Sequence, residues 1–211
     1  MKANVNTKDI GQVKDYLVRL LNKDAFDNAG LIYGMGHAVY SLSDPRSDIL
    51  MECAKMLSIE KGREYFRQFG MEDRVREFDV SSATVELAAL ALGVEGARIA
   101  KTLSFKTAEG ACMLILAAGD ARIDNSKFKG KFHFKAKMPS PDEVLEMVGH
   151  PVGGVCPFGI NEGVTVYLDE SLKRFETVFP AVGSASSAIE LNLEELYKYS
   201  NAIEWIDVCK A

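Results

Sequence analysis

Residues 99–118 of the chain read IAKTLSFKTAEGACMLILAA, and this stretch decides the expected fold. Residues 99–105 and 111–118 are apolar segments of strand length, separated by a short polar segment. The polar segment contains Glu109-Gly110, a pair that favours a turn. The two apolar segments are therefore predicted to pair as a β-hairpin.

Shorter segments with strand or helix patterns lie on both sides of this hairpin. Strands are expected at residues 75–78, 164–168, 189–191 and 203–208. Helices are expected at residues 8–23, 83–92 after a Ser81-Ser82 cap, 141–148, 169–175 and 193–199, with a long helix from Asp44-Pro45 to Gly70. Because strands and helices follow no regular βαβ order, the expected class is α+β with a mixed sheet.

The composition is that of a globular protein. The chain has 211 residues, of which 47% are hydrophobic and 26% charged, and its net charge of -5 does not announce a nucleic-acid binder. The cysteines are too far apart for a Cys-x-x-Cys pair and are expected to be reduced: Cys53, Cys112, Cys156 and Cys209. A polar start and short apolar runs predict a cytoplasmic protein with no membrane partner.

The loop at residues 149–159 is a candidate binding element. It reads GHPVGGVCPFG, with four glycines and two prolines in eleven residues. Such a stiff loop can bring backbone N–H groups close to a ligand, although a structural turn is the alternative.

Lys101 is a second candidate. In a strand it shares a face with Ile99 and Leu103, so its ammonium needs a cleft or a partner. The alternative is a lysine that reaches solvent at the end of the strand. Lys101 is expected to face the 153–157 loop across a cleft.

Several motifs occur together in the order seen in one family: AKTLSF at 100–105, GD at 119–120, ID at 123–124, KM at 137–138, GH at 149–150, VGGVCPFG at 152–159 and IEL at 189–191. Residues 57–211 thereby resemble the YbaK/EbsC family, which is related to the editing domain of prolyl-tRNA synthetase. The resemblance implies a barrel-like mixed sheet surrounded by helices. It also implies an aminoacyl-tRNA deacylase, an ester hydrolase that maintains translation fidelity in trans.

The resemblance also implies the substrate and the partners. A small amino acid such as Cys, Ala, Ser or Thr would be removed, with tRNA for proline as the expected carrier. The expected partner is the aminoacylated 3′ end of tRNA, with an aminoacyl-tRNA synthetase as a further candidate. Neither a metal nor a cofactor is expected.

The same resemblance assigns roles to individual residues. Lys101 matches the family's essential lysine, and Gly153 and Gly154 belong to the loop that cradles the terminal adenosine and the ester, so these three are the expected catalytic residues. The attacking water would be activated by the substrate's own terminal hydroxyl. Substrate-binding roles are expected for Phe78, Thr102, His150, Val155, Cys156, Pro157 and Phe158.

Two positions depart from the cysteine-editing branch of this family. Ala188 stands where that branch has an aspartate, and Phe78 where it has a tyrosine. Specificity for cysteine therefore does not follow, and a non-catalytic module that binds aminoacyl-adenosine or a tRNA end is the alternative. A Cys156 nucleophile with His150 as its base is disfavoured, because the family has small or hydroxyl-bearing residues at that position.

A lysine-rich segment follows at residues 127–137. Lys127, Lys129, Lys131, Lys135 and Lys137 interleave with Phe128, Phe132 and Phe134, while His133 is expected to face solvent. A strand would place the lysines on one face, suited to phosphate contacts. The resemblance suggests instead a helix to about Gly130 and then a strand, and a merely solvated face is an equal alternative.

The N-terminal segment resembles another family. Residues 30–40, GLIYGMGHAVY, and Asp44-Pro-Arg46 resemble a piece of citrate synthase within residues 6–56, where His37 would bind a carboxylate substrate. The other catalytic residues of that family lie in regions that the chain lacks. Residues 1–56 are therefore expected to be a non-functional helical fragment, followed by the editing domain at 57–211.

Overall fold

A computed structural model of the protein describes residues 10–22, 24, 53, 57, 60–80 and 82–210. The chain divides into two compact units, Met1–Ala54 and Lys55–Ala211. In the first unit, helix α1 (Ile10–Leu21) confirms the helix expected there, and its Val13 and Tyr16 side chains are buried. His37 and the expected start of the long helix at Asp44-Pro45 lie outside the described residues, and the domain boundary at 56–57 stays a prediction.

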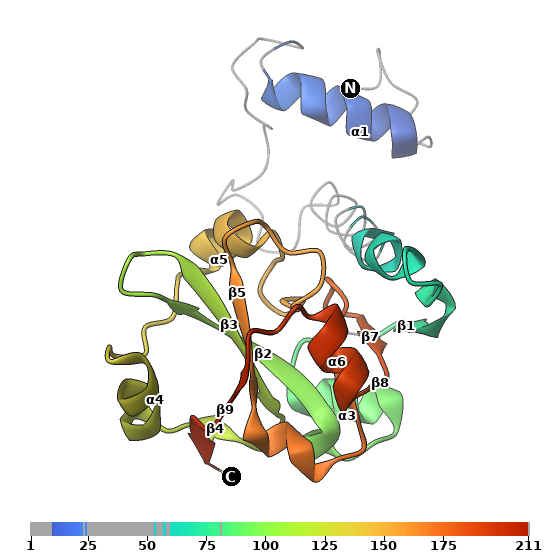
Figure 1. The fold of residues 1–211 in the computed structure, drawn as a ribbon. Helices are drawn as coiled ribbons and strands as arrows, with labels where there is room; N and C mark the ends of the chain where they lie inside the picture. Colours follow the sequence, from blue (N-terminus) through green and yellow to red (C-terminus); the bar gives the residue numbers. More distant parts are fainter. Residues whose placement is uncertain are drawn as a thin grey trace, which may run out of the picture. The chain divides into compact units, whose positions relative to one another are not determined.

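The second unit is built on a six-stranded mixed sheet in the order β8-β6-β2-β3-β5-β9 (Figure 1). Its centre is the expected hairpin, in which β2 (Ile99–Lys106) runs antiparallel to β3 (Cys112–Ala118). Strand β5 (Thr165–Asp169) runs parallel to β3, and β6 (Thr177–Pro180) runs parallel to β2. The edge strands are β8 (Leu191–Asn192) and β9 (Trp205–Ile206).

Two small ladders and several helices complete this unit. Strand β1 (Val75–Glu77) pairs with β7 (Ser187–Ile189), and β4 (Arg122–Ile123) pairs with β10 (Cys209–Lys210). The α-helices are α3 (Val85–Leu92), α4 (Asn125–Phe132), α5 (Pro141–Val148) and α6 (Leu193–Tyr199). Single 3-10 turns form η1 (Glu72–Arg74), η2 (Gly96–Arg98) and η3 (Glu170–Arg174). Figure 1 shows α4 at the left of the curled sheet, α5 above it, and α3 and α6 at its right.

The core is formed around the central hairpin. All residues of β3 are buried, because β2 and β5 flank the strand and side chains cover both faces of the sheet. Residues 60–67 are helical, and the chain turns at Gly70, whose φ is +66°. From this helix the Phe66 ring packs edge-on against the Phe158 ring, with 4.8 Å between centroids. Aromatic packing thus attaches the loop at 149–159 to the core.

The structure confirms the α+β class and corrects several expected elements. The strand at 189–191 is two short strands with different partners, and that at 203–208 is shorter and is followed by β10. Helix α3 is capped by Thr84, whose side chain accepts the Leu87 N–H, rather than by Ser81-Ser82. Strand β6 was not expected at all.

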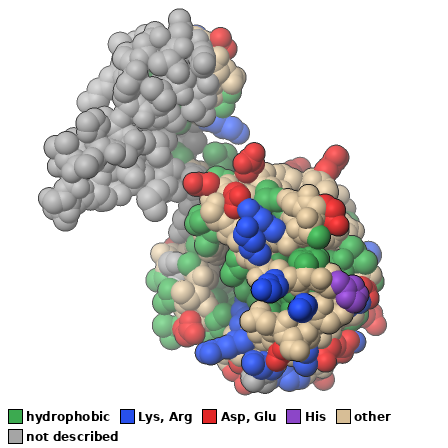
Figure 2. All heavy atoms as spheres, turned by 90° about the vertical axis from the view of Figure 1, so that its left-hand side faces the viewer, with side chains coloured by type: hydrophobic (Ala, Val, Ile, Leu, Met, Phe, Trp, Pro, Cys, Tyr) green, Lys and Arg blue, Asp and Glu red, His purple; other side chains and the backbone are tan. Residues whose placement is uncertain are grey.

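The lysine-rich segment confirms the helix suggested by the family resemblance, but not the strand expected after it or the alternative of one continuous strand. Helix α4 continues to Phe132 because Phe128 and Phe132 pack together, with ring centroids 4.8 Å apart, and His133 takes the left-handed conformation that ends the helix. No strand follows among residues 133–140. Basic side chains gather on the face that contains α4 (Figure 2).

Candidate functional site

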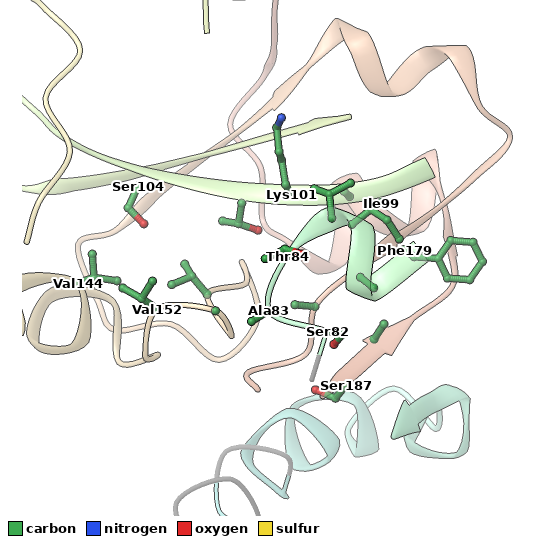
Figure 3. Close-up of a pocket in the computed structure, with 18 of the residues that line it drawn as sticks. Ser82, Ala83, Thr84, Ile99, Lys101, Ser104, Val144, Val152, Phe179 and Ser187 are labelled. Atoms are coloured by element: carbon green, nitrogen blue, oxygen red, sulfur yellow. The ribbon is translucent and has the colours of Figure 1, made fainter. Parts of the chain in front are cut away.

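Strand β2 forms one wall of a pocket of about 450 Å³ (Figure 3). The other walls come from the start of α3, from Met138-Pro139 and α5, from the 152–155 loop, and from residues of β6 and β7. Most lining residues are apolar or carry only a hydroxyl group. Lys101 is the one ionisable residue among those that line the pocket in the described part of the chain.

Two hydroxyl groups project from β2 toward the pocket. Because side chains alternate along a strand, Thr102 and Ser104 share one face, and both line the pocket. Ser104 is only 5% exposed, and the Thr102 Oγ1 is buried without a hydrogen-bond partner among the described residues. A buried hydroxyl without a partner costs about 1–3 kcal/mol. The Thr102 hydroxyl therefore marks a place where a polar group of a ligand can bind.

Lys101 contributes to the pocket wall, but its ammonium is turned away from the pocket. In Figure 3 its side chain rises from β2 on the side opposite to Ser104 and Val152. The Nζ donates to the carbonyl of Gly119 at 2.9 Å and to that of Ala121. Burial lowers the pKa of Lys101, and the nearby Arg122 acts in the same direction. Lys101 and Gly153 thus line one pocket, whereas the expected approach of the ammonium to the loop is not observed.

The loop at 152–155 lines the pocket with backbone whose conformation favours glycine. Gly153 has φ +94°, and a Cβ on Gly154 would lie 2.7 Å from the Ser184 Cα, so both positions favour glycine. The Gly154 N–H donates to the Pro151 carbonyl at 3.0 Å. The N–H groups of Gly153 and Val155 have no acceptor among the described residues, and both residues line the pocket. These two donors are available to a ligand carbonyl or hydroxyl.

His150 and Cys156 lie beneath this loop and outside the pocket lining. The His150 side chain is 1% exposed, and its Nε2 is 2.7 Å from the Phe158 carbonyl oxygen and 3.6 Å from the Cys156 Sγ. Burial lowers the pKa of His150 and raises the pKa of the Cys156 thiol to about 12. The thiol is therefore protonated near neutral pH, which disfavours a role as nucleophile.

Of the expected substrate-binding residues, only Thr102 and Val155 line the pocket. Pro157 and Phe158 are buried in the core side of the loop, and the Phe78 N–H donates to the Ser186 carbonyl outside the pocket. The lining residues that were not predicted from the sequence include Ser104, Met138, Val144 and Phe179. Ser104 follows Thr102 by two residues, so strand alternation could have identified it, whereas Phe179 lies on the unexpected strand β6.

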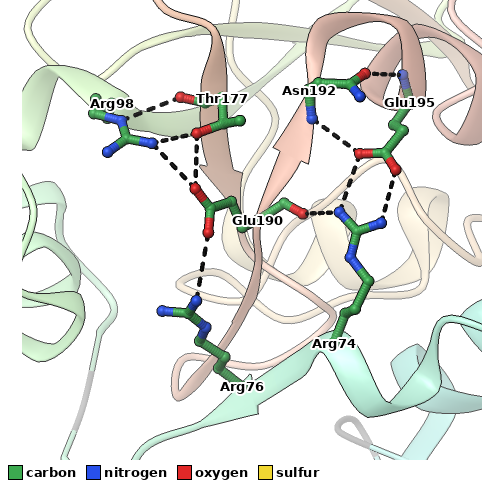
Figure 4. A network of polar contacts seen from close by, with 7 residues as sticks. All are labelled: Arg74, Arg76, Arg98, Thr177, Glu190, Asn192 and Glu195. Carbon is green, nitrogen blue, oxygen red and sulfur yellow. Dashed lines mark hydrogen bonds and ion pairs between the residues drawn. The ribbon is translucent and has the colours of Figure 1, made fainter.

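The Phe179 wall is held by a network of charged side chains (Figure 4). Glu190 accepts hydrogen bonds from Arg76, Arg98 and Thr177 at 3.4, 3.2 and 2.8 Å. The Arg98 and Arg76 guanidinium carbons lie 4.9 and 5.8 Å from the centroid of the Phe179 ring, within the range of cation–π attraction. Glu190 of the IEL motif therefore supports the pocket from outside.

A neighbouring arginine extends this network. Arg74 donates to both carboxylate oxygens of Glu195, at 2.7 and 3.0 Å, and to the Glu190 carbonyl at 2.6 Å. The Arg74 hydrogen bond lowers the pKa of Glu195. The network thus ties η1 to α6 and to the segment that joins β7 to β8.

The described residues contain no group of three or more His, Cys, Asp or Glu arranged to hold a metal ion. Among the helices of the described part, none is long and apolar enough to cross a membrane.

Comparisons with known proteins point to one family. A family model described as the aminoacyl-tRNA editing domain matches residues 80–199. The chain is 56% identical over 154 residues to the "Uncharacterized protein YwhH" of Bacillus subtilis (strain 168), which covers 73% of this chain and 98% of that protein. It is 32% identical over 127 residues to the proline–tRNA ligase of Thermosipho melanesiensis, but the match spans only 22% of the ligase.

A solved structure also points to the editing domain family. The crystal structure of a proposed trans-editing enzyme for prolyl tRNA synthetase superposes with a TM-score of 0.66 and 29% identity, over 73% of this chain and 98% of that chain. A model of the citrate synthase C-terminal domain also matches residues 1–86, which is less than half of the chain. The end of this match includes β1 and the start of α3, which belong to the sheet-based unit, so the match does not outline a separate citrate synthase fold.

Proposed function

Because this chain belongs to the aminoacyl-tRNA editing domain family, we propose that it is a deacylase that hydrolyses mischarged aminoacyl-tRNA in trans and removes a small amino acid. The observation that carries this proposal is a pocket lined by Thr102, whose hydroxyl has no partner, and by Gly153 and Val155, whose N–H groups have no acceptor among the described residues. These are polar groups suited to an ester and a ribose hydroxyl.

The reaction requires little acid–base chemistry from the protein. Water adds to the ester carbonyl, the acyl–oxygen bond breaks, and the ribose oxygen takes up a proton as the amino acid leaves. No carboxylate, imidazole or thiol is among the pocket-lining residues of the described chain. As membership of the family implies, the neighbouring hydroxyl of the terminal ribose would accept a hydrogen bond from the attacking water and relay the proton to the leaving ribose oxygen.

The backbone would supply the stabilisation of the transition state. The N–H groups of Gly153 and Val155 would donate to the oxyanion that forms when water adds to the carbonyl. A donor of this kind is typically worth about 10² to 10³ in kcat. Thr102 and Ser104 would orient the substrate through their hydroxyl groups.

The pocket favours a small acyl group. Its apolar walls include Val144 and Met138, and its polar groups on β2 are hydroxyls, which suits Ala, Ser, Thr or Cys rather than a charged amino acid. We propose tRNA for proline as the carrier, since a proline–tRNA ligase contains a similar domain, with the cytoplasm as the site of action and a prolyl-tRNA synthetase as the source of the substrate.

A panel of tRNA for proline charged with Ala, Ser, Thr, Cys or Pro tests this function. We expect the full chain to release at least one of the small non-cognate amino acids and to spare proline. The second candidate, a module that binds without turnover, is favoured by the lack of a carboxylate, imidazole or thiol among the described residues that line the pocket. It predicts binding of the charged tRNA with no release above the spontaneous rate.

A matched pair of glycine variants tests the role of the loop. Gly153→Ala and Gly163→Ala both place a side chain at a positive φ, +94° and +84°, but only Gly153 lines the pocket, and a Cβ at Gly163 would meet open space. We expect Gly153→Ala to lower kcat at least about tenfold and Gly163→Ala to leave it unchanged. Equal activity in the two variants would exclude the loop from catalysis.

A further inference from the structure

A row of basic side chains runs along the chain toward the pocket. It begins at Arg122 in β4 and continues with the lysines of α4 and of the segment that follows. Residues 125–138 contain no Asp or Glu. Arg122 and the lysine side chains at 127, 129, 131, 135 and 137 are all exposed.

Only part of this charge is neutralised within the protein. Lys127 pairs with Asp207 at 2.6 Å and donates to the Cys209 carbonyl, and Lys131 pairs with Glu204 at 2.8 Å. The four remaining cations have no acidic partner among the described residues, and we name them the basic strip: Arg122, Lys129, Lys135 and Lys137. Figure 2 shows this face, on which blue side chains gather near the centre and red ones lie mainly around the rim.

The strip ends at the pocket. The Lys137 carbonyl accepts the Lys106 N–H at 2.9 Å, which fixes this part of the chain beside the end of β2. The next two residues, Met138 and Pro139, line the pocket. A ligand that leaves the pocket on the side of Met138 and Pro139 would therefore meet the end of the strip that contains Lys137.

We propose that the basic strip binds the phosphate backbone of the RNA that carries the ester, on the segment next to the 3′ end held in the pocket. This inference rests on the proposed function, because the pocket must hold the terminal ester for the strip to meet the adjoining phosphates. Unpaired lysines and an arginine on an otherwise acidic protein suit a polyanion whose contacts do not depend on base sequence. Each phosphate contact adds about one unit to the slope of log K against log salt concentration.

Two double variants with the same change in charge test the strip. In Lys135→Gln/Lys137→Gln both lost charges belong to the strip, whereas in Lys173→Gln/Lys198→Gln they lie on η3 and α6. The substrates are the mischarged tRNA and an aminoacyl-adenosine, which has the ester but no tRNA backbone. Deacylation is measured from about 50 to about 200 mM salt.

We expect the strip variant to raise the KM for the tRNA by about an order of magnitude at low salt, and to reduce the salt slope by about 2. Its activity on aminoacyl-adenosine should equal that of the parent, and the control variant should match the parent on both substrates. A strip variant with the parental KM and salt slope on tRNA would overturn the inference and leave the proposed function intact.

If no deacylation is found, binding of uncharged tRNA, measured by fluorescence anisotropy, tests the basic strip separately from the proposed deacylase function. Absence of turnover in the parent contradicts the proposed function alone. The strip is supported if the parent binds the tRNA and the strip variant binds about tenfold more weakly, with the control unchanged. It is overturned if the parent does not bind or if both variants bind equally.

Discussion

At the scale of single residues, Thr102 shows how a pocket can be recognised from an unsatisfied group. Its hydroxyl is buried on the wall of the pocket and has no partner among the described residues. A fold gains nothing from this arrangement, because the hydroxyl has lost its hydration. We therefore propose that this hydroxyl binds a polar group of a ligand.

Thr102→Val tests this directly, because the two side chains have nearly the same shape. We expect the free energy of unfolding to stay constant or to rise by up to about 1 kcal/mol, since the unpaired hydroxyl disappears. The kcat/KM for deacylation should fall, since the substrate loses a hydrogen bond. Urea unfolding and deacylation kinetics on the same preparation measure both quantities, and unchanged kinetics would contradict the role of Thr102 in binding.

Lys101→Met removes an ammonium that holds two carbonyl groups and keeps most of the apolar stem. The Gly119 and Ala121 carbonyls lose a charged donor, so we expect the free energy of unfolding to fall by about 1–3 kcal/mol. Far-ultraviolet circular dichroism should show a retained fold, and chemical denaturation measures the loss. Unchanged stability would mean that these hydrogen bonds contribute nothing net. The catalytic role expected for Lys101 stays a prediction, which the activity of this folded variant decides.

At the scale of elements, the ion pair between β2 and α5 fixes a wall of the pocket. The Lys106 Nζ lies 2.5 Å from a Glu143 carboxylate oxygen, and the other oxygen accepts the Ser140 N–H in a capping box. The hydrogen bond from Lys106 lowers the pKa of Glu143 to about 2. Helix α5 is thus tied to the sheet by an interaction that depends on pH.

The sign of this dependence follows from the lowered pKa. Glu143 stabilises the folded state above its ordinary pKa of 4.5, and this contribution disappears as the pH falls to about 2. We therefore expect Glu143→Gln to be less stable than the parent at neutral pH and equally stable near pH 2. Urea unfolding at both values checks this, and a difference that persists near pH 2 would assign the effect to the cap instead.

The elements that sequence predicted are those with long, regular patterns. The hairpin of β2 and β3 and the helices α5 and α6 have enough apolar residues or clear capping residues to be recognised. Strand β6 has only four residues and ends in Pro180, so its pattern is too short to be distinguished from a loop. Phe179 was missed with it.

The candidate site, too, could be predicted from the sequence only in part. The strand of Thr102 and the loop of Gly153 were identified from residue types and from the family motifs, and both line the pocket. His150 and Cys156 have reactive side chains, but reactivity in a sequence does not tell whether a group is buried. Only the packing beneath the loop showed that they lie outside the pocket lining.

At the scale of the whole molecule, the family match places the editing domain within residues 80–199. The Bacillus subtilis protein is matched over 98% of its length by 154 residues of this chain, so the rest of the chain has no counterpart in that protein. The unit Met1–Ala54 is separate from the unit that contains the pocket. The pocket should therefore function without the N-terminal unit.

Removal of residues 1–54 tests this expectation. We expect residues 55–211 to fold with an unchanged unfolding midpoint in urea and to retain kcat/KM for deacylation within about twofold, because no pocket residue is lost. Size-exclusion chromatography and kinetics check the result. A truncated protein that aggregates or loses activity would give the first unit a role in the function.

Strand β7 and the residue after it have a consequence for how substrate choice can change during evolution. Ala188 lines the pocket, whereas Ile189 is in the core and Glu190 holds the arginines behind Phe179. A substitution at position 188 can therefore change which ligands fit the pocket, while Ile189 and Glu190 keep the backbone of this segment in place. A single codon change at position 188 could therefore alter the preference for the substrate, while the residues that support the pocket stay the same.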